Sequence, residues 1–288
     1  MALLMLAFTL NDTFMKLASE HLPLFQALFL RGLVTVAVLG ALAWRADAIR
    51  LPAERGDRLW LGLRTLGEIG AACFFVAALF RMPLANVTAI LQALPLAVTA
   101  AAALVLGERV GPRRWAAIAV GLVGMALIVR PGAAGWGWPA ALALLSVASV
   151  TLRDIATRKM GAHVPSHTLA LGAAVGVTAA AGLALPFAER APLALPAAAA
   201  LGASALCLVA GYLLAVAVMR SGELSLTAPF RYTGLVWALL AGWLVFGDWP
   251  DALTLLGAAI VVSAGLFTLW RERRVAAGRS GRRRARGR

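Results

Sequence analysis

The chain alternates between long apolar blocks and short polar connections. Each block is close to the roughly 20 residues that an α-helix needs to cross a bilayer. The connections are too short to hold a soluble domain. The blocks cover residues 1–17, 22–44, 59–80, 84–106, 112–130, 138–158, 166–187, 195–219, 223–246 and 251–270. The pattern predicts an all-α, polytopic membrane protein with ten transmembrane helices.

Composition agrees with this prediction. Hydrophobic residues make up 61% of the chain and charged residues 14%, whereas about a quarter of a soluble globular protein is charged. The two cysteines, Cys73 and Cys207, both fall inside predicted spans. They fit apolar packing better than a disulfide or a metal site.

The basic residues predict an orientation. Nine of the 27 Lys and Arg residues lie in the segment 271–288, directly after the last block. Ten spans place both termini on one side. If that side is the cytoplasm, eleven more basic residues lie in inner connections and four at outer ends, as the positive-inside rule requires. We therefore expect both termini in the cytoplasm, and 271–288 as a basic tail that contacts anionic lipid rather than nucleic acid.

The two halves of the chain match weakly. The matching pairs are Gly107-Glu108 with Gly247-Asp248, Thr88 with Thr227, Gln92 with Arg231, and Asp12 and Lys16 with Asp154 and Arg158. They occur in the same order and at nearly one offset. Because each half has five spans, the second half is inverted relative to the first. The sequence therefore predicts two five-helix inverted repeats, 1–132 and 138–270. Such repeats are typical of secondary transporters, whose substrate site lies near the membrane midplane.

Four motifs carry a resemblance to a known family. They are NDTFMK (11–16), PLFQALFLRG (23–32), Pro95 with LGE (106–108), and GLVGMALIVRPG (121–132). With the five-plus-five plan they resemble the drug/metabolite transporter superfamily, in particular its EamA-domain branch. Asp248 stands where that pattern usually has Glu. In overall look the chain is similar to the amino-acid exporters of the branch. The resemblance implies alternating-access transport of small metabolites, with an amino acid as the expected substrate.

Charged side chains inside the spans are candidates for function, because each costs at least about 2.5–3.5 kcal/mol at the bilayer centre. Arg64 and Glu68 lie on one helix face near the midplane. They form either a structural ion pair or part of the transport pathway. The alternatives are that Arg64 pairs with Asp154, or that Glu68 pairs with Arg31.

Two further acid–base pairs have the i, i+4 spacing, Asp12 with Lys16 and Asp154 with Arg158. In the structural interpretation the basic side chains extend to the interface and the acids neutralise them. In the functional interpretation the two pairs are symmetry-related gates.

The fourth and ninth blocks have polar residues and prolines at matching positions. Thr88, Gln92 and Pro95 share one helix face, and Thr227, Pro229, Arg231 and Tyr232 stand in the matching segment. Proline removes a backbone donor, so Pro95 and Pro229 are expected helix breaks. Arg231 either holds a substrate carboxylate or pairs with Asp12 or Glu68. The expected pathway residues are Asp12, Glu68, Thr88, Gln92, Thr227, Arg231 and Tyr232.

We find no sequence motif for catalysis, nucleotide binding or metal binding. His163 and His167 lie near the start of the seventh block and fit a loop better than a metal site. We therefore expect no enzyme activity, no cofactor and no metal. The favoured function is an inner-membrane amino-acid exporter, monomeric or homodimeric. The alternatives are a proton-coupled importer or exchanger of another small polar solute, such as an amine or a nucleoside-like metabolite, or a non-transporting sensor. Proton coupling would use Glu68 or Asp12.

Overall fold

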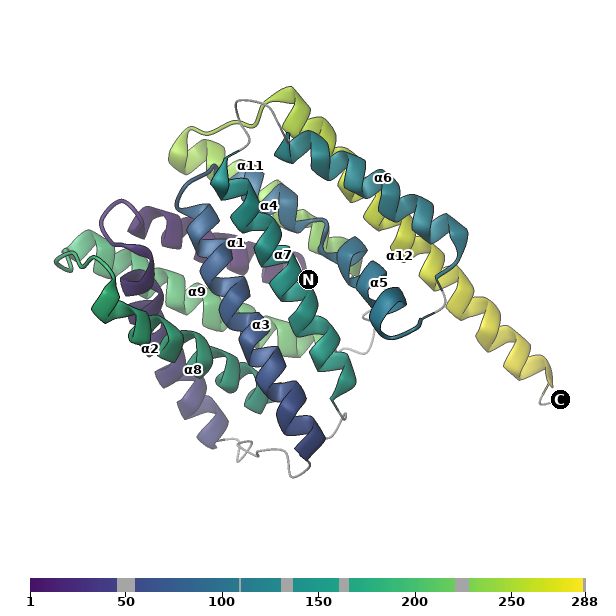
Figure 1. Ribbon diagram of the computed structural model, residues 1–288, viewed down its shortest axis with the longest axis horizontal. Coiled ribbons are helices and arrows are strands. Elements are labelled where there is room, and N and C mark those ends of the chain that lie inside the picture. Colours follow the sequence, from purple (N-terminus) through teal and green to yellow (C-terminus); the bar gives the residue numbers. More distant parts are fainter. Residues whose placement is uncertain (46–54, 109, 131–136, 161–165, 221–227, 287–288) are drawn as a thin grey trace.

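The computed structural model describes residues 1–45, 55–108, 110–130, 137–160, 166–220 and 228–286, and these ranges contain helices and no strand. The helices lie side by side in one bundle (Figure 1). They are α1 (Ala2–Ala18), α2 (Leu24–Arg45), α3 (Arg55–Leu79), α4 (Leu84–Leu91), α5 (Leu94–Val105), α6 (Pro112–Val129), α7 (Trp138–Lys159), α8 (Ser166–Ala184), η1 (Leu185–Phe187), α9 (Leu195–Arg220), η2 (Ala228–Tyr232), α11 (Thr233–Phe246) and α12 (Ala252–Arg286).

Within the described ranges, 8 helical segments are long and apolar enough to cross a membrane. The α4–α5 segment counts as one of them. Helix α1 has 17 residues, and Phe230–Phe246 is a shorter apolar helix. The all-helical, membrane-spanning fold is therefore confirmed, whereas the count of ten spans and the inverted repeats stay predictions.

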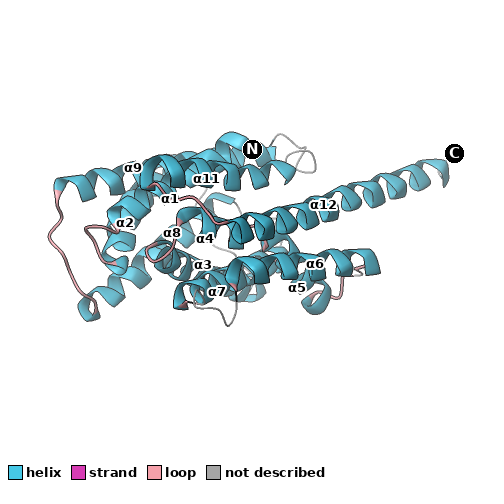
Figure 2. Cartoon of the chain, turned by 90° about the horizontal axis from the view of Figure 1, so that it is seen from above, coloured by secondary structure: helices cyan, strands magenta, loops and turns pink. Residues whose placement is uncertain are grey.

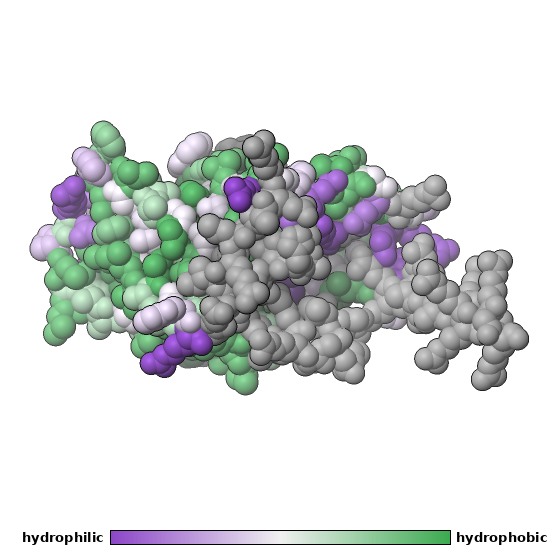
Figure 3. All heavy atoms as spheres, turned by 90° about the horizontal axis from the view of Figure 1, so that it is seen from below, coloured by the Kyte–Doolittle hydropathy of each residue, from purple (hydrophilic) through white to green (hydrophobic). Residues whose placement is uncertain are grey.

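The surface of the bundle is apolar, as lipid contact requires. Large hydrophobic side chains such as Leu104, Leu122, Leu183 and Leu244 are exposed. In the space-filling view, green covers most of the described part of the face shown (Figure 3). Polar side chains are instead found inside, for example Asn11, Gln92 and Ser146, which are buried.

The fourth predicted span is interrupted near its middle. Helix α4 ends at Leu91 and α5 begins at Leu94, with Pro95 in the first turn of α5. Proline has no N–H to donate, so it fits the start of a helix and not its interior. In the matching second-half segment, the 3-10 turn η2, which contains Pro229, leads into α11 at Thr233.

Helix packing follows a regular scheme. Helix α3 packs against α7 and α1 against α9, while α2 packs against α8 and α6 against α12. Figure 1 shows the last two pairs side by side. Each of these first-half helices has a second-half counterpart, α1 with α7, α2 with α8, α3 with α9 and α6 with α12. Exchanging the counterparts turns the pair α3–α7 into α1–α9 and leaves the pairs α2–α8 and α6–α12 unchanged.

The α6–α12 pair is held by direct backbone contact. A Cβ atom added at Gly124 would lie 2.8 Å from the carbonyl oxygen of Gly257, so only glycine fits there. Close approach of small residues is a usual basis of helix packing in membranes. Figure 2 shows α12 continuing well beyond the bundle.

Asp251 joins the same two helices at one end. Its carboxylate accepts a hydrogen bond from the backbone N–H of Thr254 at 2.9 Å and forms an ion pair with Arg130. The backbone hydrogen bond, with the help of Arg130, holds the pKa of Asp251 below its usual range. Asp251 thus caps α12 as a carboxylate.

Two glycine turns present acidic residues just beyond helix ends. Gly107 and Gly247 have φ angles of 68° and 69°, a left-handed conformation that glycine adopts without strain. The next residue in each turn bonds back across the helix end, Glu108 N to Ala102 O at 3.3 Å and Asp248 N to Gly242 O at 2.9 Å. In both turns this hydrogen bond joins residues six apart and closes the chain back over the end of the helix.

Candidate functional site

A cavity of about 690 Å³ lies inside the bundle, between helices of both halves of the chain. This volume is in the usual range for small-molecule sites, about 300–1,000 Å³. Its walls are mainly apolar and include the aromatic rings of Phe8, Phe75 and Tyr212. The other polar side chains on the wall are those of Thr9, Asn11, Asp12, Arg64, Glu68, Thr88, Gln92, Ser146, Arg153, Thr157, Arg231 and Tyr232.

Most of the residues expected from the sequence meet in this cavity. The expected pathway residues that line it are Asp12, Glu68, Thr88, Gln92, Arg231 and Tyr232. Pro95 and Arg64 line it too, whereas Lys16, Asp154 and Arg158 are not among the described lining residues. Thr227 lies outside the described residues.

The cavity is closed at one end of the bundle. Its lining includes Leu42 near the end of α2, Leu169 near the start of α8 and Leu213 in the last third of α9, which places it toward the end where α2 leads to α3. At the other end the core is dense. Met15, Leu28, Leu79 and Leu84 pack there in one hydrophobic cluster and are fully buried.

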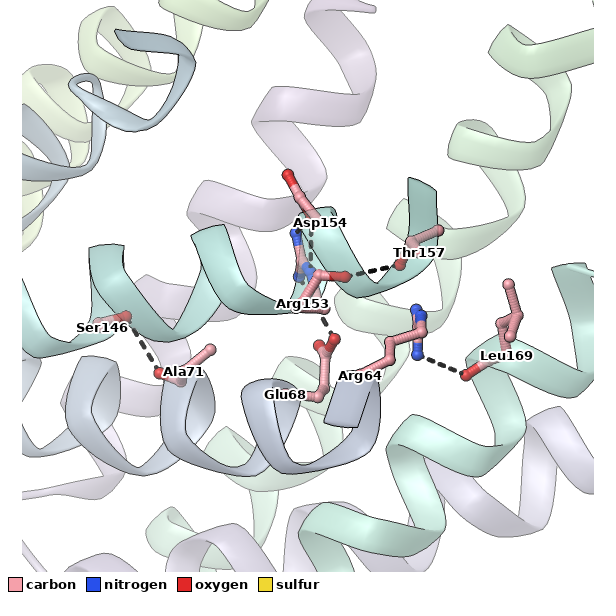
Figure 4. Close-up of polar contacts among 8 residues, drawn as sticks. All are labelled: Arg64, Glu68, Ala71, Ser146, Arg153, Asp154, Thr157 and Leu169. Atoms are coloured by element: carbon pink, nitrogen blue, oxygen red, sulfur yellow. Dashed lines mark hydrogen bonds and ion pairs between the residues drawn. The ribbon is translucent and has the colours of Figure 1, made fainter. Parts of the chain in front are cut away.

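Glu68 does not pair with Arg64, so this expectation was wrong. The carboxylate of Glu68 accepts a hydrogen bond from Arg153 Nη1 at 3.4 Å, and Arg153 also pairs with Asp154 at 2.9 Å (Figure 4). The physical reason is the close approach of α3 and α7. A Cβ atom added at Gly67 would lie 2.9 Å from the backbone nitrogen of Arg153, so glycine at that position lets α7 bring Arg153 beside Glu68.

Arg64 points away from this ion-pair cluster. Figure 4 shows its side chain turned toward α8, where Nη1 donates a hydrogen bond to the carbonyl oxygen of Leu169 at 3.1 Å. Its Nε is buried and has no hydrogen-bond partner. The suggested pair of Arg64 with Asp154 is therefore not formed, because Arg153 occupies Asp154.

On the α1 side of the cavity, Asn11 connects two charged residues. Its Nδ2 donates to Asp12 Oδ1 at 2.8 Å, and its Oδ1 accepts from Arg31 Nη1 at 3.3 Å. Ser204 donates to the same Oδ1 at 2.8 Å. The suggested pair of Glu68 with Arg31 is thus also wrong, because Arg31 lies beside Asn11 on the α1 side.

The expected pair of Asp12 with Lys16 is replaced by a longer-range contact. Lys16 Nζ lies 3.4 Å from Asp248 Oδ2 and donates to the carbonyl oxygen of Met82 at 3.0 Å. It also lies 4.8 Å from the ring centroid of Phe246, a cation–π distance. The Gly247 turn provides the physical reason, since it delivers Asp248 to the end of α1.

The expected pair of Asp154 with Arg158 is replaced in the same way. Arg158 Nη1 lies 3.2 Å from Glu108 Oε1, which the Gly107 turn delivers to the end of α7. This pair is half-exposed, with side-chain exposures of 47% and 52%, whereas the Lys16 side chain is 15% exposed. The better-buried pair lies at the closed end of the cavity.

Sequence reasoning missed Arg153 and Asn11. Arg153 is one of the eleven basic residues that the positive-inside prediction counts in inner connections, although it lies within the sixth apolar block. Both residues directly precede an acid that the repeat alignment singles out, Asp154 and Asp12. The alignment could have identified them, because each donates a hydrogen bond to the acid that follows it.

Comparison with known proteins identifies the family. Residues 1–130 match the EamA-like transporter family. A riboflavin transporter of Rhizobium johnstonii is 33% identical over 258 residues, which cover 87% of this chain and 78% of the relative. The chain belongs to the EamA-like transporter family. The expected membership of the drug/metabolite transporter superfamily is thereby confirmed.

More distant relatives are transporters as well. An S-adenosylmethionine uptake transporter of Rickettsia prowazekii is 24% identical, covering 92% of this chain and 90% of its own. The pseudopaline exporter CntI of Pseudomonas aeruginosa is 26% identical, covering 89% and 90%. A solved crystal structure shares the fold, with a TM-score of 0.57, 21% identity, and coverage of 91% of this chain and 94% of its own. The family and these relatives support a multi-pass membrane transporter of small metabolites.

Proposed function

We propose that this EamA-family member is a secondary or facilitative transporter of a small polar metabolite, which it moves by alternating access around the central cavity. The cavity carries the proposal. It gathers charges of both signs, hydrogen-bonding groups and aromatic rings inside mainly apolar walls. Such a site can bind a polar solute while the surrounding bundle excludes water.

The helix packing supports two inverted five-helix repeats. In this arrangement the 17-residue helix α1 counts as one of the ten spans. When the helices of the two halves are exchanged, the pair α3–α7 becomes the pair α1–α9. The pairs α2–α8 and α6–α12 stay the same. The left-handed glycine turns at Gly107 and Gly247, each closed by a hydrogen bond between residues six apart, supply a second likeness between the halves. Alternating access in proteins with inverted repeats comes from motion of one repeat against the other around a fixed site.

The proposed orientation places both termini in the cytoplasm of a bacterial-type inner membrane. In that orientation the cavity opens inward, and the pair Lys16–Asp248 lies at the closed outer end. The pair Arg158–Glu108 lies at the inner end and is more exposed. We propose that the outer pair holds the outer end shut, and that the inner pair becomes buried when the inner end closes.

An amino acid remains the favoured substrate, with export as the favoured direction. Its amino and carboxylate groups need an anion and a cation on the walls of one cavity, and Glu68 and Asp12 face it together with Arg64 and Arg231. Arginine binds a carboxylate through two parallel hydrogen bonds. An exporter loads its substrate from the cytoplasm, which agrees with the inward opening.

Riboflavin is the second candidate. The relative that is 33% identical is a riboflavin transporter, and the cavity has the aromatic side chains Phe8, Phe75 and Tyr212 against which a flat ring can pack. A cavity volume of about 690 Å³ leaves room for a molecule larger than most amino acids.

Purified protein in liposomes tests the proposal. Uptake and efflux are measured for the twenty amino acids, riboflavin and S-adenosylmethionine, with empty liposomes as the control. We expect saturable transport of at least one compound, and faster counterflow when the opposite side is preloaded with it. Binding without transport would indicate a sensor and would contradict the proposed function.

A further inference from the structure

We propose that Arg64 is the anion-binding residue of the cavity, and that it takes a carboxylate group of the transported compound. The inference rests on the proposed function and deepens it, because it assigns one chemical group of the substrate to one side chain. It also reverses the role expected for Arg64, since the helix spacing predicts a partner for Glu68.

Arg64 differs from the other charged residues of the cavity because most of those residues have a polar or charged partner. Among the described lining residues, three arginines face two carboxylates. Arg153 forms ion pairs with Glu68, which lines the cavity, and with Asp154, which is not among the described lining residues. Asp12 accepts a hydrogen bond from Asn11, and Asn11 accepts one from Arg31. These contacts leave Arg64 without a carboxylate within ion-pair distance.

Arg231 is the other described lining arginine that forms no ion pair with a described residue, but its surroundings differ. Arg231 is exposed in the described structure, so water can hydrate its guanidinium. Arg64 is only partly exposed, and its Nε is shut off from solvent without a partner. An incompletely satisfied cation gains most from an incoming anion when water cannot reach it. Arg64 is therefore the better anion-binding group.

The geometry leaves one nitrogen of the guanidinium, Nη2, free to bind an anion. Nη1 is held by the carbonyl oxygen of Leu169, which fixes the side chain toward α8 (Figure 4). Nε and Nη2 make no hydrogen bond with the described residues. A carboxylate in the cavity can accept a charge-assisted hydrogen bond from Nη2, which is not among the buried unpartnered atoms. Glu68, one turn along the same helix, still attracts Arg64 electrostatically, and its carboxylate is positioned to face a cationic group of the same compound.

The test compares ligands that differ in one carboxylate. Binding of L-phenylalanine and of phenethylamine, its decarboxylated counterpart, is measured calorimetrically with the purified full chain. The same comparison is made for Arg64→Gln, Arg64→Lys and Arg231→Gln, and for the matched control Arg81→Gln, an arginine outside the described lining whose Nη1 donates to the carbonyl oxygen of Ala77 at 3.0 Å. Gel filtration confirms that each variant is folded, and Arg64→Lys keeps the charge if the Gln variant is unstable.

We expect the wild-type protein to bind L-phenylalanine at least about tenfold more tightly than phenethylamine, because hydrogen bonds to charged groups are among the strongest. Arg64→Gln should reduce this preference to about twofold or less. Arg64→Lys should keep part of it, since lysine retains the charge but loses the planar fork. Arg81→Gln should keep all of it, and Arg231→Gln should reduce it less than Arg64→Gln does.

Three results would overturn the inference. The first is an Arg64→Gln variant that keeps the preference, and the second is an Arg231→Gln variant that loses it. The third is wild-type protein with no preference, although it transports riboflavin or another compound without a carboxylate. In that case the transport function stands and only the anion site fails. Wild-type protein that transports no compound of the liposome panel contradicts the proposed function itself.

Discussion

The pairing of Glu68 with Arg153, and not with Arg64, gives a quantitative prediction. Arg153→Leu removes the cation that neutralises both Glu68 and Asp154. Removing one partner of a fully buried ion pair costs about 3–5 kcal/mol. The three side chains are 27%, 16% and 32% exposed, so solvent screens part of the loss and we expect about 2–3 kcal/mol. Arg64→Leu should cost less than about 1 kcal/mol, because that arginine has no carboxylate within 4.0 Å to release.

A double-mutant cycle separates the two candidate partners of Glu68. The coupling energy between Arg153 and Glu68, whose charged atoms lie 3.4 Å apart, should be about 1–2 kcal/mol. The coupling between Arg64 and Glu68 should be below about 0.5 kcal/mol, as for residues without direct contact. Each single variant and each double variant with Glu68→Leu is required.

Thermal unfolding of the purified protein in one detergent is the assay. For a chain of this size, about 1 kcal/mol corresponds to a shift of about 2–4 °C in the unfolding midpoint. Arg153→Leu should therefore lower the midpoint by about 5 °C or more, and Arg64→Leu by less than half of that. A larger coupling of Glu68 with Arg64 than with Arg153 would refute the reasoning and restore the pair that helix spacing alone predicts.

Three further predictions concern topology and stability. A cysteine at position 138 should react with an impermeant maleimide from outside, and one at 113 only after the membrane is opened; the opposite pattern would contradict the proposed orientation. Gly124→Ala should destabilise the protein by about 1–3 kcal/mol because its Cβ meets the backbone of α12, whereas Gly172→Ala, with open space around it, should be neutral in the same melting assay. Asp251→Ala should lower stability near neutral pH, and the difference should vanish as the pH falls through the lowered pKa of Asp251; a difference that persists in acid would exclude the charged cap as its cause.

The architecture was accessible from the sequence because the bilayer imposes it. A helix has to satisfy its own backbone in lipid, so block length and apolar content determine where spans lie. The interruption of the α4–α5 span could also be anticipated, because Pro95 cannot donate a backbone hydrogen bond inside a helix. The start of α11 shows where block length fails as a measure, since the described α-helix begins at Thr233, after the 3-10 turn η2, whereas the ninth apolar block begins at residue 223.

The wall of the cavity was also largely predictable. Asp12, Glu68 and Gln92 are polar residues within apolar blocks, and the high cost of exposing them to lipid turns them toward the interior. Their partners were not predictable in the same way. Helix periodicity shows which residues share a face, as with Arg64 and Glu68, but it contains no information about which other helix packs there. The partner was decided by Gly67, whose missing side chain lets Arg153 approach.

Accessibility of the cavity from both sides tests the central claim of alternating access most directly. A single cysteine is placed at Ala72, which lines the cavity one turn from Glu68, after Cys73 and Cys207 have been replaced by alanine. Impermeant maleimide is then applied to right-side-out and inside-out vesicles, with and without a compound that the protein transports. The account predicts labelling from both sides, faster from the cytoplasmic side, with the transported compound changing both rates. Labelling from one side only, whether or not that compound is present, would contradict it.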